Sequence, residues 1–250
     1  MSTITLEDSN LFKKRKKTKP LYYSENIEPF YQPIINNKQK MIGFEALARY
    51  REDSHQAYKS VDFKSLSKDE ALYVDIIMLK SILLHLPTLA KSQVCILSIN
   101  LNPVLHCSTY QNLLLIILSQ ASKLGIVIWL EVLEIAQLNS KDVSIIEKLR
   151  NDGARIACDD FGSHKCNFQR IIMLPYDIIK LDRSLLLQAA KNAHALRMLK
   201  GMVKCLQQNN IKIVCEGVEN QKHIEIVNSL GCEYQQGYAY AIPSQLSNWL

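Results

Sequence analysis

The sequence lacks any long apolar run, any cysteine pair at metal-binding spacing and any glycine-rich dinucleotide-binding motif. Its longest purely apolar run, residues 113–118, spans six residues, whereas a membrane-spanning helix needs about 20, so we expect no membrane span. Glycine accounts for 8 of 250 residues, and no G-x-G-x-x-G pattern follows the first predicted strand, which argues against a dinucleotide-binding open sheet. The seven cysteines are isolated in the sequence. This usage favours a reduced, cytoplasmic protein without disulfides or a structural zinc site.

Basic charge is concentrated near the N-terminus. Residues 1–26 hold six Lys or Arg and three Asp or Glu, a net charge of +3, which is half of the +6 carried by the whole chain. The basic run 13–17 is followed by Thr-Lys-Pro rather than an apolar stretch, so we do not expect a signal peptide. We interpret residues 1–26 as a flexible basic leader and residues 27–250 as one domain. Nucleic-acid binding by the leader is not expected, because no helix-turn-helix, zinc finger or aromatic-interleaved basic surface accompanies it.

Short apolar runs alternate with longer amphipathic stretches through the rest of the chain. This rhythm predicts an α/β fold with a mainly parallel sheet covered by helices. About seven strands in roughly 220 residues favour a closed or nearly closed barrel over an open sheet. Glycines at positions 125, 153 and 231 predict helix ends. The predicted strands are 41–44, 94–99, 125–130, 154–158, 176–181 and 211–215, with a weaker one near 233–235, and the predicted helices are 69–86, 109–123, 140–152, 183–209 and 221–230.

Acidic and other polar side chains follow the predicted strands one after another. In a barrel of parallel strands the C-terminal strand ends lie on one face, so these side chains would converge. Carboxylates that share a pocket raise one another's pKa, and hard divalent cations such as Mg²⁺ or Mn²⁺ resolve that conflict. Any one of these acids could instead be a helix cap or part of a turn, but the series favours two metals acting at phosphorus. The series is Glu45, Asn100, Glu131, Asp159, Asp160, Lys180, Asp182, Glu216 and Gln236.

An ordered series of short motifs runs from about residue 30 to residue 243. In order they are Tyr31-Gln32-Pro33-Ile34, Gly43-Phe44-Glu45-Ala46-Leu47-Ala48-Arg49, Leu97-Ser98-Ile99-Asn100-Leu101-Asn102-Pro103, Leu130-Glu131-Val132-Leu133-Glu134, Asp159-Asp160-Phe161-Gly162, Ile179-Lys180-Leu181-Asp182-Arg183, Cys215-Glu216-Gly217-Val218-Glu219 and Gln236-Gly237-Tyr238. In this series the chain resembles the EAL domain of bacterial cyclic di-GMP phosphodiesterases. The resemblance implies a modified (β/α)8 TIM-like barrel with an antiparallel first strand, and hydrolysis of cyclic di-GMP to linear pGpG.

The resemblance also implies roles for residues at matching positions. Lys180 would orient the attacking water and stabilise charge in the transition state, Glu134 would anchor the loop after Asp160, and Gln236 would lie near that water and the substrate. A first Mg²⁺ or Mn²⁺ would be held by Glu45, Asn100, Glu131 and Asp159, and a second by Asp159, Asp160 and Glu216. Substrate contacts are implied for Gln32, Arg49, Asp182 and Gln236. The candidate catalytic residues are therefore Glu45, Glu134, Lys180 and Gln236.

Two segments depart from the family pattern. After Gly162 the family usually continues Thr-Gly-x-Ser-Ser, whereas residues 163–167 read Ser-His-Lys-Cys-Asn. His164 thus replaces a glycine, the residue that adopts positive φ at no steric cost. The stretch 62–71, which shapes the substrate rim in the family, differs as well. A second interpretation therefore stays open, in which a catalytically weak or inactive EAL module binds cyclic di-GMP or a protein partner without turnover. The resemblance favours a homodimer in either case.

Overall fold

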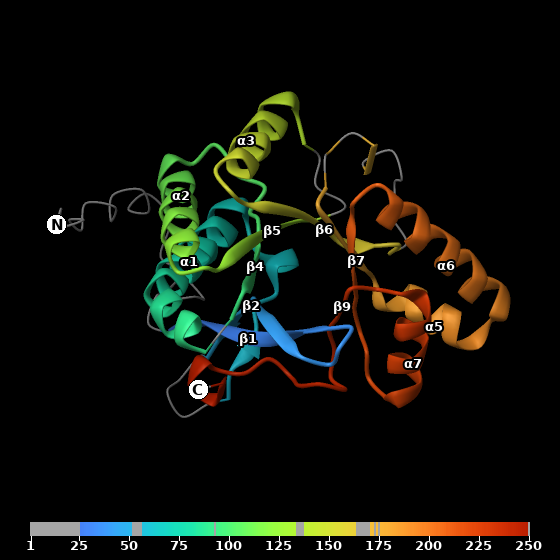
Figure 1. The fold of residues 1–250 in the computed structure, drawn as a ribbon. Helices are drawn as coiled ribbons and strands as arrows, with labels where there is room; N and C mark the ends of the chain where they lie inside the picture. The colour runs from blue at the N-terminus through green and yellow to red at the C-terminus, as the bar shows by residue number, and fades with distance from the viewer. Residues whose placement is uncertain are drawn as a thin grey trace.

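A closed barrel of strands with helices around it is the architecture of the chain (Figure 1). Helices α1 and α2 lie on one side of the strands, α3 lies beside β5 and β6, and α5, α6 and α7 cover the opposite side. This computed structural model describes residues 26–51, 57–92, 94–133, 138–163, 171–172, 174 and 176–249. Apart from Asn26, the proposed leader lies outside the described residues.

Eight strands of the described part close the barrel, and one short strand, β3, is added at its side. Hydrogen bonds join them in the order β1-β9-β8-β7-β6-β5-β4-β2-β3, and a further pairing of β1 with β2 closes the ring. The barrel pairs from β2 round to β9 are parallel, whereas β1 is antiparallel to both of its neighbours. The expected modified (β/α)8 barrel is confirmed. Its strands are β1 (Ile27–Asn36), β2 (Met41–Tyr50), β3 (Lys59–Ser60), β4 (Ile96–Asn100), β5 (Val127–Leu133), β6 (Arg155–Phe161), β7 (Ile178–Leu181), β8 (Lys212–Cys215) and β9 (Tyr234–Gln235).

Strand β1 was not among the strands predicted from apolar runs, because it contains Pro29 and Pro33. Proline cannot donate to a sheet ladder and usually argues against a strand. Here Tyr31 exchanges both of its backbone hydrogen bonds with Ser244, on the side away from β2. Backbone groups alternate in direction along an antiparallel strand, so both prolines also turn their nitrogen away from β2. The β1–β2 ladder therefore loses no hydrogen bond to them.

The helices begin and end largely where the sequence predicts. Gly125, Gly153 and Gly231 adopt positive φ angles of 75°, 105° and 79° after α2, α3 and α7, which confirms them as helix ends. The single helix predicted over 183–209 is wrong: the chain leaves helical geometry at Asn192, whose side chain accepts a hydrogen bond from His194 N and starts a new helix. The helices are α1 (Lys68–Lys91), α2 (Ser108–Lys123), α3 (Ser140–Asn151), α5 (Arg183–Lys191), α6 (Ala193–Gln208) and α7 (Gln221–Leu230), with short 3₁₀ turns η3 (Phe63–Ser65) and η4 (Leu246–Trp249).

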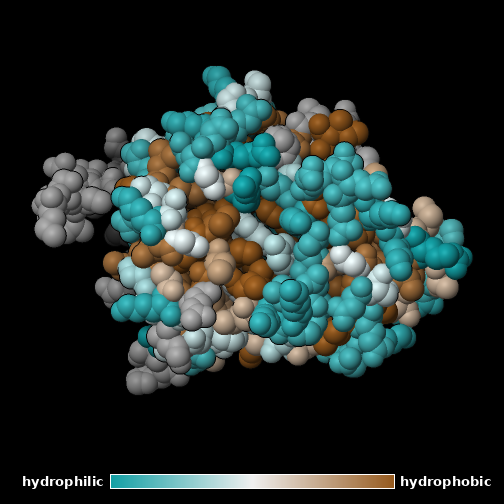
Figure 2. Space-filling view, viewed as in Figure 1, coloured by the Kyte–Doolittle hydropathy of each residue, from teal (hydrophilic) through white to brown (hydrophobic). Residues whose placement is uncertain are grey.

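Helix α1 is long and apolar enough to cross a membrane by length and composition alone. In the fold it packs against α2 and against strands β1 and β2. A core helix of a soluble protein passes the same test, so the expected lack of a membrane span stays a prediction. On the face seen in Figure 2, apolar side chains gather near the centre, and hydrophilic ones prevail over α5, α6 and α7.

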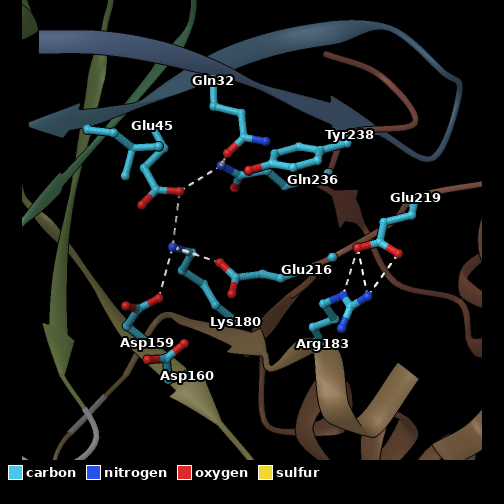
Figure 3. A pocket seen from close by; sticks show the side chains of 13 residues that line it. Gln32, Glu45, Asp159, Asp160, Lys180, Arg183, Glu216, Glu219, Gln236 and Tyr238 are labelled. Carbon is cyan, nitrogen blue, oxygen red and sulfur yellow. Dashed lines mark hydrogen bonds and ion pairs between the residues drawn. The ribbon is translucent and has the colours of Figure 1, made fainter. Parts of the chain in front are cut away.

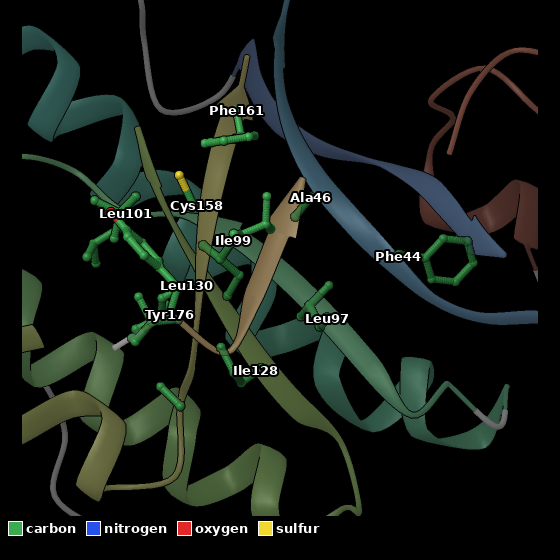
Figure 4. Close-up of a cluster of buried hydrophobic side chains, with 14 of the residues drawn as sticks. Phe44, Ala46, Leu97, Ile99, Leu101, Ile128, Leu130, Cys158, Phe161 and Tyr176 are labelled. Atoms are coloured by element: carbon green, nitrogen blue, oxygen red, sulfur yellow. The ribbon is translucent and has the colours of Figure 1, made fainter. Parts of the chain in front are cut away.

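The two faces of each barrel strand pack against different partners. Outward-facing side chains such as Phe44 and Leu97 belong to the large core that the helices cover (Figure 4). On β2, Gly43 faces inward, where an added Cβ would lie 2.4 Å from the carbonyl oxygen of Ile96; only glycine allows β2 and β4 to approach so closely. Inside the barrel, side chains from six strands form a separate cluster, here called the apolar plug: Ile34, Ile96, Trp129, Ala157, Ile178 and Val214.

Candidate active site

A ring of polar side chains lies one layer above the apolar plug. Side chains alternate between the two faces of a strand, so the residue two positions beyond a plug residue again points into the barrel. Strand β1 runs in the opposite direction, and there Gln32, two positions before Ile34, takes the equivalent place. Gly43 and Tyr234, which packs on the plug, occupy the corresponding positions on β2 and β9. The polar ring consists of Gln32, Glu45, Ser98, Glu131, Asp159, Lys180, Glu216 and Gln236.

Seven of these eight residues were predicted from the sequence, but β2, β4, β5 and β6 extend further than predicted. Glu45, Glu131 and Asp159 lie within β2, β5 and β6 instead of following them. Their inward direction is therefore fixed by the sheet itself. Glu216 and Gln236 do follow their strands directly.

The ammonium group of Lys180 occupies the centre of the polar ring (Figure 3). Its Nζ lies 2.7 Å from Glu131 Oε2, 2.8 Å from Glu216 Oε1, 2.9 Å from Asp159 Oδ1 and 3.4 Å from Glu45 Oε2. The lysine side chain is only 3% exposed. Burial lowers the pKa of Lys180, but the surrounding carboxylates, Asp159 first among them, raise it well above the usual value. Lys180 is thus held as a cation.

One lysine is too little positive charge for this group of acids. Burial, followed by the charge of Glu45, raises the pKa of Glu131 well above its usual range. Burial also raises the pKa of Glu216 to about 8, although Lys180 opposes it. The pKa of Asp160 rises to about 6 through desolvation and the nearby charge of Asp159. Such raised values are expected where carboxylates crowd together, and they mark the site as one that favours an additional cation.

Three of the carboxylates could hold a metal ion together. Oxygen atoms of Asp159, Asp160 and Glu216 all lie within 4.8 Å of one another. Asp160 should face away from the barrel interior because it follows Asp159, but its φ of 56° is left-handed and the β6–β7 register shifts between Cys158 and Phe161. The unusual backbone brings the second carboxylate to the same side as the first. A non-glycine residue in this region costs free energy, and such strain is common at functional sites.

The amide of Gln236 links the carboxylates to strand β1. Its Nε2 donates to Glu45 Oε2 at 2.6 Å and to Gln32 Oε1 at 3.2 Å, while Gln32 Nε2 donates to the carbonyl of Ala241. The other end of the amide, Gln236 Oε1, is buried and has no hydrogen-bond partner among the described residues. A buried acceptor of this kind is costly, so it is suited to a ligand that brings a donor or a cation.

A cavity of about 370 Å³ opens above the polar ring. Its volume falls in the range typical of small-molecule sites. It is lined by Gln32, Glu45, Leu47, Asp159, Asp160, Lys180, Arg183, Glu216, Gly217, Glu219, Gln236, Gly237 and Tyr238. Most of the candidate site residues thus share one cavity.

Four candidate residues are placed differently. Asn100 pairs in register with Glu131 but lies a further layer along the barrel from Ser98, and it lines a smaller cavity. Arg49 donates to the carbonyl of Ala48, and Asp182 caps α5 by accepting from Ser184 N at 2.9 Å; neither lines the large cavity within the described residues. Glu134 and residues 164–167 lie outside the described residues.

Several residues of the site have roles that were not predicted from the sequence. Ser98 Oγ donates to Glu131 Oε1 at 2.5 Å; its position two residues before Asn100 was the available signal. Arg183 forms a bidentate pair with Glu219 at the cavity rim, at 2.8 and 2.9 Å, and Tyr238, which is 65% exposed, also lines the cavity. Arg183 begins α5, and Glu219 and Tyr238 stand on loops; the strand pattern places none of the three.

A protein-family model that matches most of the chain agrees with the fold and the polar ring. The EAL domain family model matches residues 21–243, and the chain belongs to the EAL domain family. It is 29% identical over 132 residues to the cyclic di-GMP phosphodiesterase NbdA of Pseudomonas aeruginosa, covering 52% of this chain and 17% of that protein. It is 26% identical over 226 residues to the probable cyclic di-GMP phosphodiesterase PdeG of Escherichia coli, covering 87% of this chain and 44% of that protein.

The chain spans less than half the length of both of these relatives. Among solved structures it resembles the Bacillus subtilis YkuI protein, which has an EAL domain, in complex with cyclic di-GMP and calcium. The TM-score is 0.74 at 23% identity, over 91% of this chain and 59% of that one. At this identity the likeness concerns the fold.

Proposed function

We propose that the chain hydrolyses cyclic di-GMP to linear pGpG with the help of divalent metal ions. The observation that carries the proposal is the ring of four carboxylates around the buried Lys180 Nζ, with Asp160 brought to the same side. Membership of the EAL family, whose curated relatives include named cyclic di-GMP phosphodiesterases, supports it. In the reaction the water oxygen bonds to phosphorus and the bond to the ribose 3′ oxygen breaks, which leaves pGpG.

The donor set fits hard divalent cations. All the proposed ligands offer oxygen, which Mg²⁺ and Mn²⁺ prefer. Five of the six are carboxylates, and Lys180 is the cation that contacts four of them directly. Bound there, two cations would lower the pKa of a water molecule and neutralise negative charge on the phosphate. The proposed sets are Glu45, Asn100, Glu131 and Asp159 for one ion, and Asp159, Asp160 and Glu216 for the other.

The remaining polar groups suit the substrate. Lys180, held as a cation, would stabilise the negative charge that develops on the phosphoryl oxygens. Gln236 and Gln32 form one hydrogen-bonded chain from Glu45 to the cavity wall, which would position the phosphate side of the ligand. We propose Arg49 and Asp182 as peripheral contacts and Glu134 as an anchor for the loop after Asp160.

The test is direct. Purified protein is incubated with cyclic di-GMP and Mg²⁺ or Mn²⁺, and the products are separated. Glu45→Gln removes one charge of the ring without changing its shape and should abolish pGpG formation. Glu147→Gln on the exposed side of α3 is the matched control and should leave it unchanged.

Two results would contradict the proposal. Cyclic di-GMP that binds but stays intact at saturating metal would identify a receptor, the second interpretation of the altered loop at 163–167. pGpG formation that survives Glu45→Gln would place the chemistry elsewhere. The same preparation tests the expected homodimer by its mass in solution.

A further inference from the structure

An acidic residue of α1 lies in an otherwise apolar helix face, outside the polar ring. Asp75 is flanked on α1 by Val74, Met78 and Leu79, which are all buried. Asp75 and Asn100 both line a small cavity of about 30 Å³ between α1 and strands β2 and β4. A carboxyl group in such surroundings is costly unless it is hydrogen-bonded, so its presence calls for a specific partner.

That partner is Asn102, two residues beyond the proposed metal ligand Asn100. Asn102 Nδ2 donates to Asp75 Oδ2 at 2.6 Å, and the Asn102 residue is only 3% exposed. The other groups of Asn102 are also engaged: its Oδ1 accepts from Val104 N at 2.8 Å, and its backbone N–H donates to Tyr110 Oη at 2.9 Å. The Asp75 bond is therefore one of three that fix this residue between α1, α2 and the end of β4.

The same bonds constrain Asn100. On one side, Asn100 is in register with Glu131 at the end of β4. On the other side, Leu101 N donates to Glu131 O at 2.8 Å and Asn102 is held as described. The backbone that carries the Asn100 side chain is thus fixed on both sides. Among the described residues, no residue of the polar ring contacts Asp75, so its effect on the site would act through Asn102. Without Asp75, the buried amide of Asn102 would lose its acceptor, which costs free energy, and the segment would relax to recover one.

We propose that Asp75 is a positioning residue that holds Asn100 in place as a metal ligand through Asn102. The inference rests on the proposed function, because it takes Asn100 as a ligand. Groups that orient metal ligands from outside typically change metal affinity by about 10- to 100-fold when they are removed.

The test is a double-mutant cycle read by calorimetric titration with Mn²⁺ alone. Asp75→Leu, which keeps the branching at Cγ but has no acceptor, should weaken Mn²⁺ binding about ten-fold or more. Asn100→Ala should weaken it as well. Because Asp75 acts through Asn100, adding Asp75→Leu to Asn100→Ala should cause no further loss. Asp75→Asn retains an oxygen acceptor and should restore most of the affinity.

Val74→Ala is the matched control for a general weakening of α1. It removes apolar contacts one residue away and should leave Mn²⁺ affinity unchanged in the folded protein. The inference would be overturned if the losses of Mn²⁺ affinity add fully in the Asp75→Leu/Asn100→Ala double variant, or if Val74→Ala loses as much affinity as Asp75→Leu. Either result would leave the proposed function intact. An unaltered protein that binds no Mn²⁺ would overturn the proposed function and the inference with it.

Discussion

Replacing Lys180 with methionine removes the positive charge shared by four carboxylates while keeping most of the side-chain volume. Lys180 Nζ lies 2.7–3.4 Å from oxygens of Glu131, Glu216, Asp159 and Glu45, and its side chain is 3% exposed. At an effective dielectric constant of about 20, one pair of unit charges about 4 Å apart attracts by roughly 4 kcal/mol. Desolvation offsets much of the sum over four pairs. Removal of one partner from a buried ion pair usually costs about 3–5 kcal/mol, because the remaining charge is left uncompensated.

We therefore expect Lys180→Met to lower the free energy of unfolding by about 3–5 kcal/mol in a chelator. For a chain of this size the melting temperature should fall by about 6–20 °C. Saturating Mn²⁺ should recover much of the loss, since a ligand that binds only the folded state stabilises it. In the same variant hydrolysis of cyclic di-GMP should be abolished even with metal bound.

The control is Lys212→Met. Its ammonium lies 3.6 Å from Glu233 and its side chain is 55% exposed, and exposed pairs contribute only about 0–1 kcal/mol. Thermal unfolding of both variants, with chelator and with Mn²⁺, separates the two cases. If Lys180→Met melts with the unaltered protein in chelator, or if Mn²⁺ leaves the gap unchanged, the electrostatic reasoning is refuted.

In chelator the free energy of unfolding should fall as the pH rises from about 5 to about 8, because the pKa of Asp160 is raised from 3.8 to about 6 and that of Glu216 from 4.5 to about 8. Over this range the folded state keeps protons that the unfolded state has released. Urea unfolding at several pH values measures the free energy of unfolding. A free energy that rises with pH would contradict the raised pKa of Asp160 and Glu216. Asp160→Gly relieves the left-handed backbone at φ 56°. In a chelator the variant should be more stable by about 1 kcal/mol, whereas its Mn²⁺ binding should be weaker. Lower stability in the chelator would show that the backbone is not strained at Asp160. Gly237→Ala places a Cβ 2.2 Å from the carbonyl oxygen of Val218 and should lower the free energy of unfolding by about 1–3 kcal/mol. Gly201→Ala, with open space inside α6, should instead raise the free energy of unfolding by about 0.5–1 kcal/mol. Urea unfolding of both variants compares the two, and equal effects would contradict the predicted clash at Gly237.

Much of the fold could be predicted because parallel strands leave a strong signal. Strands buried on both faces give continuous apolar runs; six of the eight barrel strands were found in this way, and β9 was predicted from a weaker signal. The break at Asn192 was missed because apolar periodicity continues across it; the asparagine is a good N-cap, but an isolated one within a helical pattern is weak evidence for a break. The ends of β2, β4, β5 and β6 were placed too early, since the apolar run stops where the polar side chains begin although the hydrogen-bonded ladder continues.

The polar ring itself could be predicted from alternation along parallel strands, but its closure could not. Gln236 and Glu45 are 191 residues apart, and they meet only because β1 joins β9 to β2. Strand β1 contains two prolines and was not predicted from the pattern of apolar residues. Nothing local in the sequence therefore specifies that Gln32 and Gln236 face Glu45. The carboxylates around Lys180 depend on the parallel strands, whereas the amides depend on the antiparallel one. A substitution that loosens β1 should therefore disturb the Gln32–Gln236–Glu45 chain before it disturbs the remaining carboxylates.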